Sequence, residues 1–205
     1  MAKLEDFEKL LKSVLAEWDK AESDIKIAEQ LGHQVVFPAI KELRYAGRRI
    51  VDALARILAN DDNGKITALL DDALFDCYRA RHDAIDASIS TIAAEMDVTA
   101  KKLGYNSVLK AFPDYPSLLE TLAEAQEKIA SSRGRREDRD AIYQAIEQCE
   151  LAKVVKLYRA FKLSEHVMRS IAKEDRFWPK MGFLATIVSI VIAIVAIGVA
   201  IYFAK

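Results

Sequence analysis

The feature of this sequence that most constrains its fold is a long uncharged stretch at its C-terminal end. No Asp, Glu, Lys or Arg occurs in residues 181–204, although such residues make up 30% of the chain. An apolar helix of about 20 residues is long enough to cross the hydrocarbon core of a bilayer. Only Thr186 and Ser189 bring small polar side chains into the stretch. We therefore predict a single transmembrane helix over residues 181–204.

The charges that flank this stretch predict its orientation. Basic residues gather before it and only one follows: Arg169, Lys173, Arg176, Lys180 and then Lys205. Cytoplasmic segments next to a span are enriched in Lys and Arg. The N-terminal residues are amphipathic and charged, unlike a signal peptide. We expect a tail-anchored protein of the inner or plasma membrane with its N-terminus in the cytoplasm.

Residues 1–176 have the apolar periodicity of helices. No segment shows the sustained alternation of apolar and polar residues that is typical of a half-buried strand. We expect helices over about 4–31, 38–59, 65–103 (with a bend or break near 96–99), from 117, and 138–173, then a kink at Pro179. Long helices with short connections predict an all-α, elongated cytosolic bundle, completed by other copies of the chain. On the second helix we expect Ile40, Val51, Leu54 and Leu58 to face the core, as Leu15 does on the first.

The small residues of the uncharged stretch fall on one line. They are spaced by four, three, four, three and four positions, namely Gly182, Thr186, Ser189, Ala193, Ala196 and Ala200. This period of 3.5 residues is that of a left-handed helix–helix seam. In lipid, small residues let helix backbones approach, and hydroxyl groups can hydrogen-bond between helices. We expect three or more copies to associate here, either by packing alone or around a narrow pore that Thr186 and Ser189 face.

The best candidate for a ligand surface is a basic stripe on the second predicted helix. It comprises Lys41, Arg44, Tyr45, Arg48 and Arg49. Spacings of three, four and seven residues place most of these cations on one helix face, where they could hold the phosphates of a nucleotide or oligonucleotide. The alternative is an ion-paired outer surface, with partners on the third helix: Asp71, Asp72, Asp76, Asp83 and Asp86. The turn Arg133–Arg136 is expected to be solvated, with anionic lipid or nucleic acid as its alternative partner.

The sequence has no specific catalytic or metal-binding pattern. Cys77 and Cys149 lie far apart and are expected to be reduced and buried, and the histidines His33, His82 and His166 are too dispersed to share a helix face. We expect the histidines to be solvated or hydrogen-bonded. We therefore expect no cofactor, no metal and no enzymatic activity.

One spacing supports a different interpretation. Residues Arg159 to His166 have the Arg-to-His spacing that resembles the motif of HEPN ribonucleases, which are helical domains that dimerise to cut RNA. Ala160 stands where that motif usually has a polar residue. A HEPN-like ribonuclease therefore remains an alternative prediction.

The layout of a helical domain followed by one terminal span with a small-residue seam resembles the single-pass membrane effectors of bacterial anti-phage defence, such as the Hailong type. The resemblance covers this layout and no signature motif, so no functional residue is carried over from it. It implies a cytosolic sensor that responds to a nucleotide or oligonucleotide and controls a membrane pore. We expect an oligomeric membrane effector or channel. The alternative is a membrane-tethered adaptor that binds a partner protein without conducting.

Overall fold

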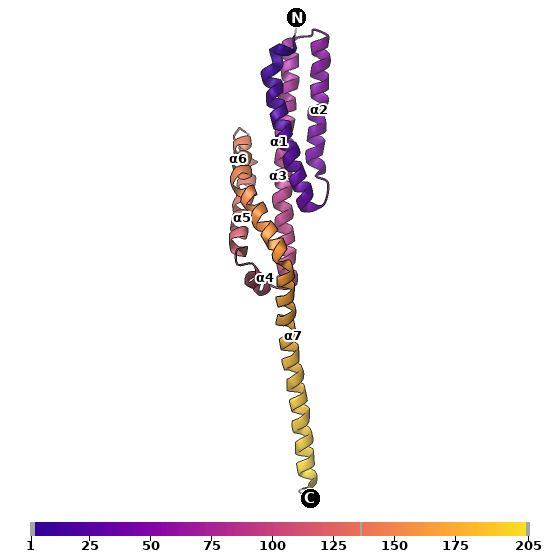
Figure 1. The fold of residues 1–205 in the computed structure, drawn as a ribbon, viewed down its shortest axis with the longest axis vertical. Coiled ribbons are helices and arrows are strands. Elements are labelled where there is room, and N and C mark those ends of the chain that lie inside the picture. Colours follow the sequence, from indigo (N-terminus) through magenta and orange to yellow (C-terminus); the bar gives the residue numbers. More distant parts are fainter. Residues whose placement is uncertain (1–2, 136, 204–205) are drawn as a thin grey trace. The chain divides into compact units, whose positions relative to one another are not determined.

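The structure, a computed structural model, describes residues 3–135 and 137–203; at 176, 178–180, 195 and 197–203 it describes the backbone only. The described residues form helices and no β-strand, so the all-α class is confirmed (Figure 1). In chain order, the elements are η1 (Leu4–Phe7), α1 (Glu8–Gly32), α2 (Phe37–Leu58), α3 (Asn63–Leu103), α4 (Tyr105–Ala111), α5 (Tyr115–Ser132), α6 (Arg139–Ala145), the π-helical segment η2 (Ile146–Leu151) and α7 (Ala152–Phe203).

The chain divides into two compact units that are interleaved in sequence. The first unit comprises the described residues of 1–97 and 117–158, and the second comprises those of 98–116 and 159–205. Helices α3 and α7 each contribute to both units. The first unit holds the helices on which the basic stripe and its expected acidic partners lie.

Two left-handed residues form the turns of the α1–α2–α3 hairpins. Gly32 is the last residue of α1, and His33 after it takes the positive φ of 49°. Asn60, with φ of 53°, follows α2. The carboxylate of Asp62 then accepts a hydrogen bond of 3.1 Å from the Lys65 backbone amide, and so satisfies one of the free donors at the start of α3.

Two expected interruptions are absent from the described backbone. Helix α3 runs without a break through residues 96–99, and α7 remains helical at position 179. A break is therefore absent at both places, while the bend near 96–99 and the kink at Pro179 stay predictions. A proline inside a helix removes one backbone hydrogen bond, which weakens the helix without always ending it.

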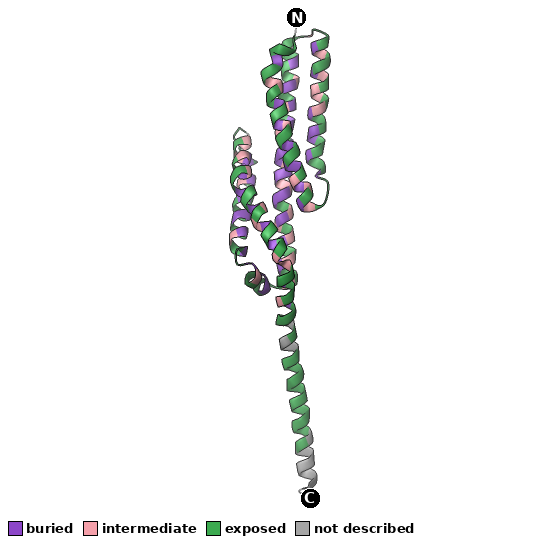
Figure 2. Cartoon of the chain, in the orientation of Figure 1, coloured by how far each residue is buried: buried purple, intermediate pink, exposed green. Residues whose placement is uncertain are grey.

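Small residues form the core where α1, α2 and α3 meet. The buried alanines of this cluster are Ala21, Ala28, Ala39, Ala46, Ala73, Ala80 and Ala84. Larger side chains, including Phe7, Ile57 and Leu70, fill a second cluster toward the start of α1. Figure 2 shows the buried positions of these helices in purple. Because alanine adds little bulk, the three helices can approach closely along their shared length.

The second unit has an aromatic core. Phe161 of α7 is fully buried, and its ring centroid lies 5.7 Å from that of Phe112 and 6.0 Å from that of Tyr115. Lys110 and Asn106 of α4 both contact the Asp175 carboxylate of α7, at 3.5 and 3.1 Å. These contacts hold α4 against the part of α7 that precedes the uncharged stretch.

Several residues expected in the interior are exposed. The exposed fractions are 61% for Leu15, 57% for Val51 and 85% for Leu58, and Ile40 and Leu54 are exposed as well. The prediction failed because the apolar stripes of α1 and α2 are wider than the surface that α3 covers. The prediction for Cys149 was also wrong, since this residue of η2 is exposed while Cys77 is buried.

Candidate functional site

The structure separates the basic stripe on α2 into paired and unpaired cations. The guanidinium of Arg49 lies 2.9 Å from Asp72 and 3.2 Å from Asp76, both on α3. Arg48 instead pairs with Asp52 one turn along its own helix, at 2.9 Å. Ion pairing, the alternative considered for this surface, therefore describes Arg49 and Arg48.

The remaining members of the stripe gather around one aromatic ring. The Lys41 ammonium lies 5.5 Å and the Arg44 guanidinium 5.7 Å from the ring centroid of Tyr45. All three residues are exposed, and no carboxylate of the described residues pairs with either cation. A cation over an aromatic face is attracted by the ring quadrupole. These two cations are therefore held in place yet keep their capacity to bind an anion.

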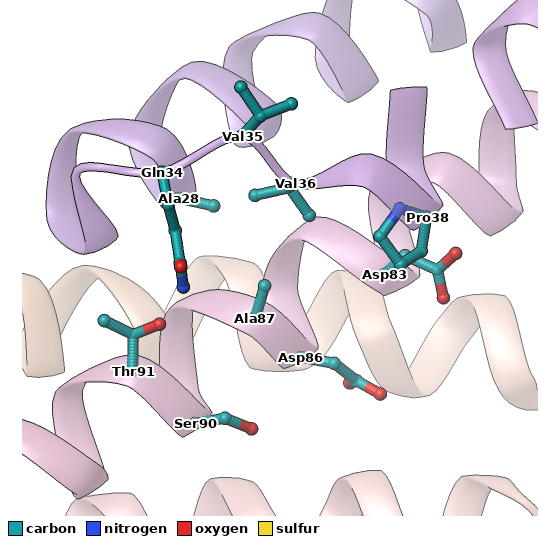
Figure 3. A pocket seen from close by; sticks show the side chains of 10 residues that line it. All are labelled: Ala28, Gln34, Val35, Val36, Pro38, Asp83, Asp86, Ala87, Ser90 and Thr91. Atoms are coloured by element: carbon teal, nitrogen blue, oxygen red, sulfur yellow. The ribbon is translucent and has the colours of Figure 1, made fainter. Parts of the chain in front are cut away.

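The other expected acidic partners have different roles. Asp83 and Asp86 line a pocket of about 350 Å³ between the α1–α2 connection and α3 (Figure 3). Burial, followed by the charges of Glu42 and Asp86, raises the pKa of Asp83. Burial also raises the pKa of Asp86, although the Tyr143 hydroxyl donates a hydrogen bond of 2.8 Å to it. No Lys or Arg of the described residues lines this pocket. It therefore suits a cation better than a phosphate.

The expected C-terminal helix is exposed on all sides where its side chains are described. Every residue from Met181 to Ile194 is exposed in α7. The Thr186 hydroxyl donates to the Gly182 carbonyl and the Ser189 hydroxyl to the Ala185 carbonyl, both at 2.9 Å. Within α7 these hydroxyl groups are thus satisfied by their own helix.

The described residues do not reach the end of the predicted span. Among them, no helix has an apolar stretch long enough to cross a membrane. The predicted span over 181–204 extends past this part of the chain. Ala193 and Ala196 of the predicted seam are exposed, and Ala200 lies outside the described side chains.

A buried polar cluster between α1, α3 and α6 was not predicted. We call it the Arg81 cluster: Glu17, Asp24, Arg81, His82, Asp86, Asp140 and Tyr143. Arg81 has no exposed surface and forms ion pairs with Glu17 of α1 and, at 2.5 Å, with Asp140 of α6. Its neighbours at −4, +3 and +7 are Cys77, Ala84 and Ser88, all buried. This spacing was the sequence signal that Arg81 points inward.

His82 and Tyr143 extend the Arg81 cluster toward α6. Their rings are stacked with centroids 3.9 Å apart, and His82 Nε2 lies 3.6 Å from the Asp140 carboxylate. His82 is therefore buried against charged and aromatic groups, so solvation was the wrong expectation for it.

Asp24 is the least compensated member of the Arg81 cluster. The residue is 5% exposed, and its Oδ2 has no hydrogen-bond partner among the described residues. Burial raises the pKa of Asp24 to about 7, and the charges of Glu147 and Glu17 add to the rise while Arg81 opposes it. This group is therefore about half ionised near neutral pH.

The Arg-to-His pair that resembles the HEPN motif lies on one helix. Arg159 and His166 are both exposed on α7, and His166 Nδ1 lies 3.0 Å from the Leu163 carbonyl oxygen. No described hydrogen bond joins the two side chains. The ribonuclease alternative stays a prediction, and RNA cleavage that survives Arg159→Ala with His166→Ala would exclude it.

The described residues contain no group of three or more His, Cys, Asp or Glu side chains arranged to hold a metal ion. Comparison with protein-family models, with curated proteins and with solved structures finds no match.

Proposed function

We propose that the protein is an oligomeric membrane effector of the inner or plasma membrane, in which residues 181–204 span the bilayer and copies pack around a narrow pore. One observation carries this proposal: the described residues from Met181 to Ile194 expose apolar side chains on every side of α7. Phe183, for example, is 67% exposed. Contiguous apolar surface of this kind is unfavourable in water and needs a cover. Lipid, together with neighbouring copies, provides one.

The hydroxyl groups of the seam support the same proposal. Thr186 and Ser189 donate to carbonyl groups of their own helix, which lowers the free energy needed to bring them into lipid. Small side chains at the remaining seam positions let helices approach closely. A pore lined by such residues would be slim and poorly wetted, and could close by losing its water.

In this proposal the helical units control the pore. The ligand that they bind is a nucleotide or an oligonucleotide. The support is the pair of unpaired cations beside Tyr45, which present a positive surface to phosphate groups. The resemblance to effectors of anti-phage defence agrees with this assignment, in which the helical units bind the ligand and α7 forms the pore. A ligand can shift such an assembly only if it binds the open and closed arrangements with different affinity.

The test is ion flux from liposomes that contain the purified full-length protein. Replacing Thr186, Ser189 and Ala193 together with leucine should abolish flux, because bulky side chains would fill the seam. The matched control replaces Ile187, Ile190 and Ile194 with leucine, which changes off-seam positions and conserves their volume. Flux that survives the seam replacement would refute the pore.

A second function is favoured by the exposed apolar residues of α1 and α2. A membrane-tethered adaptor would bind a partner protein there without conducting ions. Replacing residues 181–204 with an unrelated membrane anchor separates the two functions. The adaptor should retain its activity in cells, whereas the effector should lose it.

A further inference from the structure

Apolar residues of η1, α1 and α2 that are exposed or half-buried make up a surface of the first unit. We call it the α1–α2 face: Leu4, Leu11, Leu15, Trp18, Gly47, Ile50, Val51, Leu54 and Leu58. An open groove of about 300 Å³ runs between the helices, lined by members of this face and by Val14. The exposed fraction is 54% for Leu4, and values for Leu15, Val51 and Leu58 are higher. The groove thus combines an apolar floor with exposed apolar sides.

The spacing of this face is that of a helix-packing seam. Residues 4, 11, 15 and 18 of the N-terminal segment, and 47, 51, 54 and 58 of α2, follow steps of three, four and seven. Such steps present a stripe to another helix. Because α3 packs on the buried alanines of α1 and α2, it leaves this stripe uncovered.

The contact between Trp18 and Gly47 fixes which positions of the two helices are level. The Trp18 ring lies 3.5 Å from the place that a Cβ on Gly47 would take. The helices are antiparallel, so Leu11 is level with Leu54, and Leu15 is within one residue of the level of Val51. By the same register, Glu22 is within one residue of the level of Arg44, and Asp19 within two of the level of Arg48.

We propose that the α1–α2 face pairs two copies of this chain about a two-fold axis along the groove, with α1 of each copy against α2 of the other. In a two-fold interface, residue i meets j and j meets i. The pairing sets leucines against Val51 and Leu54, and sets Asp19 and Glu22 of one copy against Arg48 and Arg44 of the other. These side chains are exposed and opposite in charge at nearby levels. Within one copy, Arg48 also pairs with Asp52 and Glu22 with Lys26, and the pairing between copies adds to these exposed contacts.

The complementarity of the face to itself argues for a second copy rather than an unrelated protein. The pattern ends at Lys26, which is within two residues of the level of Lys41, so the interface extends no further than Glu22 and Arg44. The inference goes beyond the proposed function, since it concerns residues 4–58 and holds whether or not α7 forms a pore. If both hold, the assembly contains an even number of copies.

Crosslinking between two co-expressed full-length chains tests this pairing. One chain carries Leu15→Cys and the other Val51→Cys, each with Cys149→Ser to remove the exposed native thiol. A disulfide between the chains is expected after mild oxidation of the detergent-purified protein. The control moves the first cysteine to the exposed residue Ser13, outside the face, where the yield should fall at least tenfold.

Charge reversal supplies the decisive comparison. Arg44→Glu with Arg48→Glu in both chains, or Asp19→Arg with Glu22→Arg in both, should each reduce the crosslink at least tenfold. Placing the first pair in the Val51→Cys chain and the second in the Leu15→Cys chain should restore it, because every facing pair is then opposite in charge. Restoration also shows that the variants fold.

The result that overturns the inference is the absence of the 15–51 crosslink, or a crosslink that charge reversal leaves unchanged. An unrelated partner on this face, with the chain monomeric, would give the first of these results. The seam replacement Thr186→Leu, Ser189→Leu and Ala193→Leu distinguishes this failure from that of the pore. If ions flow but the 15–51 crosslink is absent, only the pairing of copies is refuted. If the crosslink forms but no ions flow, only the pore is refuted.

Discussion

Two sides of α3 are packed by different chemistry. Toward α1 and α2 it presents mainly small apolar side chains, among them Ala73, Ala80 and Ala84. The ion pairs on this side include those of Asp72 and Asp76 with Arg49 of α2, and of Arg81 with Glu17 of α1. Toward α6 it presents Arg81 and Asp86, which pair with Asp140 and Tyr143. Apolar contact depends little on pH or salt, whereas buried charges are stable only while their partners stay in place. We therefore expect the packing of α1, α2 and α3 to be stable across conditions. We expect the contact between α3 and α6 to weaken when a charged partner is lost.

The largest expected effect comes from removing the central cation of the Arg81 cluster. Arg81→Leu keeps an apolar body but leaves Glu17 buried, and Asp140 half-buried, without the guanidinium partner. Breaking a buried ion pair in this way costs about 3–5 kcal/mol. Circular dichroism during thermal unfolding should show a clear loss of stability, with α6 detaching first in hydrogen exchange.

Arg169→Leu is the matched control for this substitution. Arg169 forms an exposed pair with Glu165 one turn away on α7. Exposed pairs contribute about 0–1 kcal/mol. Equal losses of stability in the two variants would contradict the distinction between the sides of α3.

Asp24 should make the stability of the Arg81 cluster depend on pH. Its pKa is raised from 3.8 to about 7, so the folded protein binds this proton more tightly than the unfolded chain. Stability from the protonated group is therefore present at acid pH and is lost as pH rises from about 4 to 7. Asp24→Asn stays neutral, so its stability advantage over the native protein should be smallest near pH 4 and roughly 2–3 kcal/mol larger at pH 8 than at pH 5.

This difference is measured by denaturant unfolding of the two proteins across pH 4–8. Asp83 and Asp86, whose pKa values are also raised, remain in both proteins and cancel from the difference. A constant difference between the curves at all pH values would show that Asp24 ionises normally.

The smallest effect is expected for one hydrogen bond across the α3–α6 contact. Tyr143→Phe keeps the ring stacked on His82 but removes the hydroxyl that donates to Asp86 at 2.8 Å. The loss should be about 1–2 kcal/mol, since the acceptor is charged and half-buried. Tyr45→Phe, at an exposed ring, should change stability by much less in the same thermal measurement.

The helical periodicity predicted the all-α class and most of the helix positions because local spacing determines which face of a helix is apolar. It could not show how much of each face another helix covers, so Leu15, Val51 and Leu58 were placed in the interior. The acidic partners of Arg49 were among those expected on α3. The Arg81 cluster was missed because Arg81 and Asp140 lie 59 positions apart, and nothing local pairs them.

The π-helical segment Ile146–Leu151 precedes α7 and affects its rotational phase through the backbone alone. A π-helical turn holds one residue more than the α-helical turn it replaces. Since each residue of an α-helix turns the chain by about 100°, a return of this segment to α geometry would rotate every later position of α7 by about that angle. Each later position of α7, Gly182 included, therefore takes its phase along the helix from a single turn that ends more than 30 residues earlier.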